Sequence, residues 1–231
     1  MTHPAKAAKV LRKTTRKTSR RQQYSQSTRK ALLESAEALF SERGYSGTSL
    51  DEVVAAARVT KGALYHHYNG KLAVFEAVLE RCEATAVKKI TRDVRREKDP
   101  WQKALVGVRS FLDVCQEQSY RRIVMQEGPV ALGYERWREI EERSSFGLVR
   151  DIVRSVLKEA NIDESILETF TRVFFGALSA AGMSVSQAED PETASEEVQT
   201  VIALMVAGLR RLADDAQGLV DRSPDEIINS R

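Results

Sequence analysis

The residues best suited to bind a partner lie in one short stretch, Thr60 to Tyr68, with the sequence TKGALYHHY. Its hydroxyl, ammonium, imidazole and phenol groups can hydrogen-bond the edges of nucleic-acid bases or backbone phosphates. Leu64 is the main aliphatic residue of the stretch, so we expect it to face a core. Exposed aromatic and histidine groups on so short a helix suit a groove better than water. The stretch therefore predicts a helix that reads nucleic acid.

Short helices and tight turns are expected to position this stretch, with helices at about 28–43, 50–57 and 60–67. Ser49 and Glu52 form a capping box at the start of the second of these helices. Thr60 caps the third after a tight turn. The first helix carries a buried apolar stripe and stops at Gly44. Two short helices joined by a turn of about three to four residues, behind a supporting helix, define a helix-turn-helix.

The rest of the chain is also predicted to be helical. The five prolines fall mostly at natural breakpoints, and no run of alternating β-branched residues is long enough to build a sheet. We expect Gly128-Pro129 to end a short helix, and the further helices to cover about 71–96, 100–118, 120–127, 134–160, 164–187 and 191–215. The predicted fold is all-α with about nine helices. Its expected parts are an arm (1–27), a helix-turn-helix head (28–70), a helical body (71–215) and a polar tail (216–231).

The formal charge of +3 is unevenly distributed. Residues 1–30 hold ten lysines or arginines and no acid, which leaves 36 − 10 = 26 basic residues against 33 acids, or −7, in the rest. The composition of residues 1–27 predicts a disordered cationic arm in the free protein. Such an arm neutralises phosphates and adds salt-sensitive affinity for DNA, and it could also lie in a minor groove.

Composition also restricts the compartment. The longest unbroken apolar run, Val201 to Leu209, is far shorter than the about 20 residues that a spanning helix needs, so no membrane partner is expected. The N-terminal region lacks the apolar segment of a secretory signal. Cys82 and Cys115 are expected to be reduced and buried. These features predict a cytoplasmic protein.

Catalysis has little support in the sequence. We find no Gly-rich phosphate loop, His-Glu-x-x-His, Cys-x-x-Cys or Gly-x-Ser-x-Gly pattern. With three histidines, two of them adjacent, the chain offers little for metal or triad chemistry. We therefore assign no catalytic residue, metal or cofactor, and disfavour an enzyme.

The stretch GYSGTSLDEVVAAARVTKGALYHHYNGKLAVFEAV resembles the DNA-binding domain of the tetracycline-repressor (TetR) family, over about residues 28–80. The pattern T-K-G-x-L-Y-x-H-[FY]-x-x-K is specific, and EGPVALGYERWREIEE is a weaker match to a body motif. The resemblance implies a three-helix DNA head and a body that dimerises and holds an inducer. It implies DNA contacts by Thr48, Ser49, Thr60, Lys61, Gly62, Tyr65, His66, His67 and Lys71.

Several of these roles have structural alternatives. Gly62 would let the backbone approach DNA, or is only a tolerated helix glycine. Tyr65 would reach phosphates or base edges, or is half-buried. Ser49 could be only a cap, and His67 could pack inside the head. Lys71 opens the next helix, where its ammonium and the helix amides could share one phosphate.

Two positions differ from the usual family pattern. Tyr68 stands in place of a more usual phenylalanine and is expected in the core with its hydroxyl outward. Arg58 sits where members usually have glycine, so a positive φ there would cost on the order of 1 kcal/mol. The alternative is a slightly different turn, which puts the fine turn geometry in doubt but not the motif.

The body offers an interface and a pocket. Together with the resemblance, small residues and an apolar stripe on the last two helices predict a homodimer through Gly176, Ala177, Ala180, Ala181, Val198, Ile202, Met205 and Leu209; the alternative is internal core. Candidates for an apolar effector pocket are Trp101, Phe111, Cys115, Met125, Trp137, Phe174 and Met183, although residues of these types are more often plain core. Few convergent charges appear among them, which favours a small hydrophobic effector.

The sequence thus predicts a DNA-binding transcriptional regulator: a repressor that binds a palindromic operator as a dimer and is released by a small molecule. Two alternatives stay open. One is a constitutive or architectural DNA-binding protein without an effector, which the size of the body disfavours. The other is an activator of the same fold.

Overall fold

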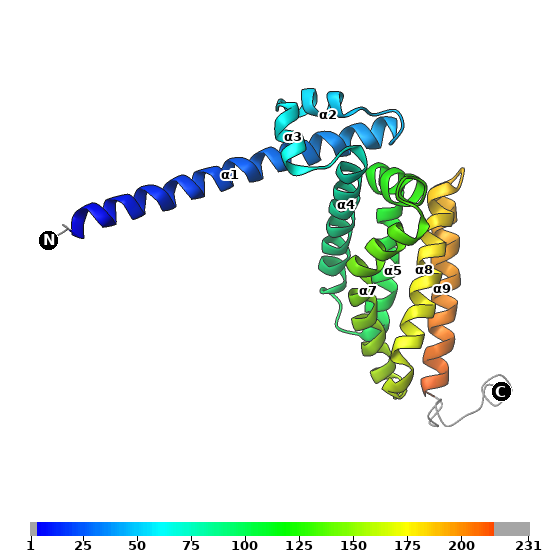
Figure 1. Ribbon diagram of the computed structural model, residues 1–231. Helices are drawn as coiled ribbons and strands as arrows, with labels where there is room; N and C mark the ends of the chain where they lie inside the picture. The colour runs from blue at the N-terminus through cyan, green and yellow to red at the C-terminus, as the bar shows by residue number, and fades with distance from the viewer. Residues whose placement is uncertain (1–3, 215–231) are drawn as a thin grey trace. The chain divides into compact units, whose positions relative to one another are not determined.

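The computed structural model describes residues 4–214, with the side chains of residues 22–211 and 213; the predicted polar tail lies outside this range. Within it there is no strand, and the nine α-helices confirm the all-α prediction (Figure 1). They are α1 Pro4–Arg43, α2 Leu50–Ala57, α3 Lys61–His67, α4 Lys71–Val94, α5 Pro100–Gln116, α6 Gly128–Leu132, α7 Tyr134–Glu159, α8 Leu167–Gln187 and α9 Pro191–Asp214. A π-helical segment, η1 (Tyr120–Glu127), and a 3₁₀ turn, η2 (Glu164–Ile166), complete the order.

The chain forms two compact units that meet inside α4, between Val78 and Leu79. The sequence placed this boundary at Gly70, where the chain breaks. The first turns of α4 belong to the first unit, and their residues Val74 and Phe75 are fully buried. The Phe75 ring meets the Phe40 ring of α1 edge-on, with 5.1 Å between centroids.

The core of the first unit lies where α2 and α3 pack on the C-terminal part of α1 (Figure 1). Leu32, Ala36 and Phe40 form the expected buried stripe of α1. Val53 of α2 and Leu64 of α3 are fully buried against it. Gly44 has φ 76° and ends α1, as expected for a residue that adopts the left-handed conformation without strain.

The first helix begins at Pro4 rather than near Thr28. Sequence reasoning gave priority to the charge of residues 1–27 and overlooked their helix propensity. Proline is favoured at a helix start, and Ala, Lys, Arg and Gln, which dominate this segment, are strong helix formers. The disorder expected of this segment in the free protein stays a prediction.

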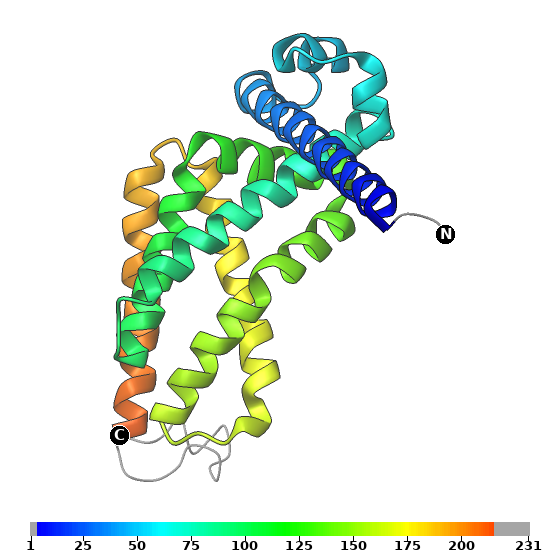
Figure 2. The same ribbon diagram turned by 90° about the vertical axis from the view of Figure 1, so that its left-hand side faces the viewer.

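The second unit is a bundle in which α5 contacts α7, α8 and α9, and α8 also packs on α7 and α9. Figure 1 shows α8 and α9, in yellow and orange, next to each other, and in Figure 2 the two helices are close where the chain passes from one to the other and diverge toward their opposite ends. The short helix predicted at 120–127 ends there as η1, and α6 follows it directly with Pro129 near its start, where the missing N–H is harmless. None of the helices in the described part of the chain is long and apolar enough to cross a membrane.

Candidate DNA-binding interface and effector cavity

The start of α2 is fixed by the predicted capping box. The backbone N–H of Glu52 donates to the Ser49 hydroxyl oxygen at 3.2 Å, and the Ser49 N–H donates to the Glu52 carboxylate at 2.8 Å. The bond from the Ser49 N–H, followed by one from the Ser49 hydroxyl, holds the pKa of Glu52 below its usual range. Arg43, the last residue of α1, donates to Glu52 at 2.8 Å. The cap thus also ties α2 to α1.

The turn between α2 and α3 contains a residue in the left-handed conformation, at the position where the sequence left the turn geometry open. Arg58 has φ 54° and ψ 42° and forms the C-cap of α2. Its N–H donates to the carbonyl of Ala55, and that of Val59 donates to Val54, each at 3.2 Å. An exposed arginine therefore occupies a backbone conformation that favours glycine.

The exposed face of α3 gathers most of the residues predicted to contact DNA. Thr60 caps the helix by accepting from the Ala63 N–H at 3.2 Å. Leu64 is buried, whereas Tyr65 is 58% exposed. The other exposed residues of the helix are Lys61, Gly62 and His66.

Gly62 leaves this surface open. A Cβ built there would have only the Thr60 hydroxyl oxygen nearby, at 3.9 Å. Nothing inside the protein therefore requires glycine at this position. A ligand backbone approaching the helix would be a reason for it.

Two lysines of the motif already have partners inside the protein. The Lys61 Nζ lies 2.7 Å from a carboxylate oxygen of Asp51 in α2, which raises the pKa of Lys61. The Lys71 Nζ lies over the Tyr45 ring, 4.4 Å from its centroid. Both contacts fix the direction of a flexible cation before any partner binds.

Three other predicted contacts are placed less favourably for DNA. Thr48 is buried, and its hydroxyl donates inward to the carbonyl of Gly44 at 2.9 Å, so a phosphate contact by this side chain is not supported. His67 is half-buried. Its burial lowers its pKa most, and the charges of His66 and Arg29 lower the pKa further. Ser49 is exposed but is committed to its cap. Sequence patterns name residue types but do not show which way these side chains turn.

Tyr68 is buried, as expected, but its hydroxyl is not free at the surface. The phenol oxygen accepts a hydrogen bond from the Arg29 Nε of α1 at 3.2 Å. This bond ties the end of the reading helix to the supporting helix. It gives the tyrosine a structural role that phenylalanine could not fill.

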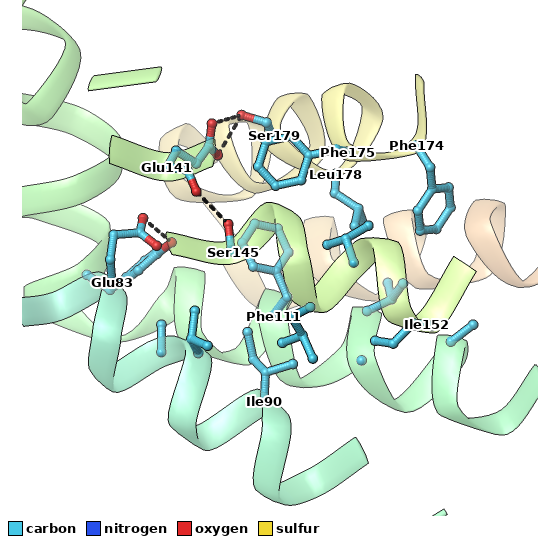
Figure 3. A pocket seen from close by; sticks show the side chains of 18 residues that line it. Glu83, Ile90, Phe111, Glu141, Ser145, Ile152, Phe174, Phe175, Leu178 and Ser179 are labelled. Atoms are coloured by element: carbon cyan, nitrogen blue, oxygen red, sulfur yellow. Dashed lines mark hydrogen bonds between the residues drawn. The ribbon is translucent and has the colours of Figure 1, made fainter. Parts of the chain in front are cut away.

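A cavity of about 690 Å³, a volume that includes its part open to solvent, lies within the second unit (Figure 3). Of the predicted lining residues, Phe111 and Phe174 contribute to its wall. The other five predicted pocket residues do not line it: Trp101, Cys115, Met125, Trp137 and Met183. Trp101, Cys115, Met125 and Trp137 are buried core, because large apolar residues fill a bundle interior unless a neighbour leaves space.

Sequence reasoning missed the polar end of this cavity. Glu83 of α4 and Glu141 of α7 are 1% and 4% exposed and both line it. Tyr120, Ser145 and Ser179 lie beside them in the lining. Figure 3 shows the two carboxyl groups at one end, away from Ile152 and Phe174. The sequence signal that could have indicated this polar end is a glutamate on the otherwise apolar face of its helix.

The two carboxyl groups have different partners. Glu141 accepts from the Ser179 hydroxyl at 2.8 Å and pairs with the Arg138 guanidinium at 2.9 Å. Burial nevertheless raises its pKa. Among the described residues, Glu83 accepts a hydrogen bond from the Tyr120 hydroxyl at 3.0 Å, and burial raises its pKa to about 8.

The helices predicted to dimerise turn part of the expected stripe inward and expose the rest together with apolar residues that were not predicted. Val198, Ile202 and Leu209 of α9 pack into the unit's own core, because this face of α9 meets α5. Of the predicted α9 residues, Met205 is exposed, at 64%. Ala177 and Ala180 of α8 are exposed, and Gly176 and Ala181 are half-buried. The large apolar side chains that reach solvent on these two helices also include Val173 of α8 and Val201 and Leu204 of α9.

Comparison with known proteins identifies both parts of the chain. Residues 32–78 match the family described as "Bacterial regulatory proteins, tetR family". Residues 101–209 match "Tetracyclin repressor-like, C-terminal domain". The two matches cover the helix-turn-helix and most of the helical bundle.

Individual relatives agree with these matches. The chain is 26% identical to the transcriptional regulator SrpR of Pseudomonas putida over 153 residues, covering 65% of this chain and 71% of SrpR. It is 30% identical to the regulator TtgW of Pseudomonas putida over 101 residues, covering 44% of this chain and 75% of TtgW. The crystal structure of a TetR-family regulator from Pectobacterium atrosepticum superposes with a TM-score of 0.70 at 25% identity, covering 80% of this chain and 95% of that one. The chain therefore belongs to the TetR family of DNA-binding transcriptional regulators.

Proposed function

We propose that this regulator is a repressor that binds a palindromic operator as a homodimer and leaves it when a small molecule occupies the cavity. The observation that carries the proposal is one chain with an exposed reading helix and a cavity lined largely by apolar residues. The printed names of the relatives support regulation of transcription. Such a protein acts where the chromosome is, so the cytoplasm is its expected compartment.

The proposed DNA contacts centre on the exposed face of α3. Lys61 and Tyr65, one helical turn apart, share a face that can enter a major groove. Gly62 and His66 lie beside them, and Thr60 opens the helix. At the start of α4, Lys71 and the first helix amides are proposed to hold one phosphate.

The proposed dimer uses the exposed stripe on α8 and α9. Val173, Leu204 and Met205 are 69%, 69% and 64% exposed, which is high for large apolar side chains on two helices that pack on each other. The small residues Ala177 and Ala180 would let a partner helix approach closely. A symmetric dimer also gives two reading helices, which a palindromic site requires.

Selection of bound sequences from a random DNA library, followed by footprinting, tests the proposal. We expect one short inverted repeat, protected by a dimer whose mass is measured by light scattering. Protection without a preferred sequence would instead indicate an architectural protein. A transcription assay on the selected site would separate repression from activation.

A further inference from the structure

The cavity combines an apolar wall with a strongly acidic end. Its wall includes Phe111, Phe174 and Leu178, while Glu83 and Glu141 stand at the other end (Figure 3). None of the described residues that line it is a lysine, an arginine or a histidine. A ligand that fits this lining must be apolar along most of its length and complementary to carboxyl groups at one end.

Glu141 is already compensated by the protein. The Arg138 guanidinium pairs with it, and the Ser179 hydroxyl donates to both of its oxygens, at 2.8 and 3.1 Å. The same guanidinium lies over the Phe175 ring, 4.9 Å from its centroid, so its position is fixed from two sides. Glu141 therefore needs no charge from a ligand.

Glu83 lacks such compensation. It is 1% exposed, and its hydrogen-bond partner among the described residues is the neutral hydroxyl of Tyr120. Burial raises the pKa of Glu83 to about 8, with Glu141 adding to the rise, and no cation opposes it. At neutral pH the carboxyl group is therefore mostly protonated in the empty cavity.

We propose that the cavity binds an amphipathic organic cation, whose protonated amine pairs with Glu83 while its apolar body lies among Phe111, Phe174 and Leu178. The inference rests on the proposed function, because it names the chemical class of the effector. On binding, the ligand arrives as an ammonium ion, and Glu83 releases its proton to solvent and becomes the counter-ion.

A cation fits this site better than a neutral or an anionic ligand. An ammonium group gains a full ion pair with Glu83 where few water molecules screen it. An anion would meet two carboxyl groups and no free positive charge, and a neutral ligand would gain only a hydrogen bond.

Three ligands that differ only in their head group test the proposal: 4-phenylbutylamine, 4-phenyl-1-butanol and 4-phenylbutyrate. Calorimetry on the full chain at pH 7 is expected to show the amine binding at least about tenfold more tightly than the alcohol, with the carboxylate weakest. Tighter binding of the alcohol or the carboxylate, or binding of none, overturns the proposal. This comparison needs no variant.

A matched pair of variants then locates the head group. Glu83→Gln keeps the shape and the acceptor for Tyr120, and it is expected to abolish the preference for the amine over the alcohol. Glu80→Gln removes a carboxylate one turn earlier on α4, outside the lining, and is expected to bind like wild type. Equal effects of the two changes would place the amine elsewhere.

Proton release provides a second readout. Amine binding to wild type at pH 7 is expected to release a proton, seen as a binding heat that depends on the buffer, and Glu83→Gln is expected to lose this dependence. The other titratable groups near Glu83 are Tyr120 of η1, Cys115 of α5 and Glu141 of α7, and burial raises the pKa of each. Release that survives in Glu83→Gln would assign the amine to Glu141 and contradict the proposal.

The ligand class and the proposed function fail separately. If the amine binds through Glu83 but does not release the selected operator, the repressor mechanism is wrong and the ligand class stands. If the operator is bound and is released by the alcohol or the carboxylate but not by the amine, the regulator stands and the ligand class is wrong.

Discussion

The Lys61 ammonium lies 2.7 Å from one oxygen of the Asp51 carboxylate and 2.8 Å from the other. This contact joins the first residue of α3 to the first turn of α2, across the turn of the helix-turn-helix. Both side chains are largely exposed, so the pair adds little to stability. The pair matters for DNA binding, because the Asp51 carboxylate competes with a DNA phosphate for the Lys61 ammonium.

Removing that competitor is expected to strengthen DNA binding. Asp51→Asn should tighten binding to the selected operator about threefold at low salt, because Lys61 is freed and a negative charge near phosphate is lost. Lys61→Ala should weaken binding and lower the salt slope by about 1 per subunit. Fluorescence anisotropy across a salt series measures both.

The double variant separates the two possible causes of tighter binding, which are the release of Lys61 and the loss of the Asp51 charge near phosphate. If Asp51 acts through Lys61, Asp51→Asn should have no effect in the Lys61→Ala background. An unchanged gain in that background would mean that Asp51 repels DNA directly. Wild-type affinity for both Lys61→Ala and Tyr65→Ala would show that α3 is not the reading helix.

The left-handed conformation of Arg58 predicts that glycine stabilises the turn. Arg58→Gly is expected to raise the free energy of unfolding by about 1 kcal/mol, because φ 54° strains any residue with a Cβ. Chemical denaturation measures the change. Arg58→Ala is the control, since it removes the charge but keeps the Cβ, and it should not gain stability. Weaker DNA binding by both variants would indicate that the Arg58 side chain also contacts a phosphate.

Local rules of helix capping and hydrophobic spacing predicted the head correctly. The capping box of Ser49 and Glu52, the Thr60 cap and the buried Leu64 each depend on residues within one turn of one another. The burial of Thr48 was not foreseen, because its inward hydrogen bond to Gly44 depends on how the loop folds back. Its residue type alone suits either role.

The body was harder to predict because its contacts join distant segments. On α9, two apolar stripes compete: Ile202 belongs to the one that packs inward and Met205 to the one that reaches solvent. The acidic end of the cavity brings together Glu83 and Glu141 from α4 and α7. No local pattern in the sequence predicts that two glutamates so far apart line one space.

The buried carboxyl of Glu83 predicts that stability falls as the pH rises. Its pKa in the folded chain, about 8, lies above the ordinary 4.5, so its contribution is fully present below pH 4.5 and is lost as the pH rises through 8. For this group alone the free energy of unfolding is expected to fall by up to roughly 5 kcal/mol over that range. Urea denaturation at several pH values measures the slope.

The isosteric change isolates this carboxyl. Glu83→Gln is expected to flatten the slope, leaving the smaller part that comes from Glu141, whose pKa burial also raises. Glu80→Gln serves again as the control on the same helix. A slope that is equally steep in Glu83→Gln would show that Glu83 ionises in the folded chain as freely as it does in water.

The exposed stripe on α8 and α9 predicts a specific way to break the proposed dimer. Leu204→Glu places a charge at a position that is 69% exposed, so the single chain should fold normally. In a dimer through this stripe the charge would be buried without a partner, which costs several kcal/mol. Sedimentation at micromolar concentration should show monomers, with weakened operator binding. Arg172→Glu, an exposed reversal of charge on α8, tests whether charge alone disrupts the assembly.

The cationic segment of residues 1–30 predicts an affinity that depends on salt but not on sequence. It holds ten lysines or arginines and no acid. Each cation placed near a phosphate releases a counter-ion, which steepens the decline of binding with salt. Deleting residues 2–20 is therefore expected to weaken binding to the operator and to unrelated DNA by similar factors, and to flatten both salt slopes.

The same deletion tests whether the helix of this segment depends on DNA. The structure gives helix from Pro4, whereas the repulsion among its cations favours disorder in the free chain. Phosphates would relieve that repulsion, so circular dichroism should show helix gained when DNA is added to the full chain and not to the truncated one. Equal signals with and without DNA would mean that the helix forms by itself. A salt slope that truncation leaves unchanged would remove the segment from the DNA interface.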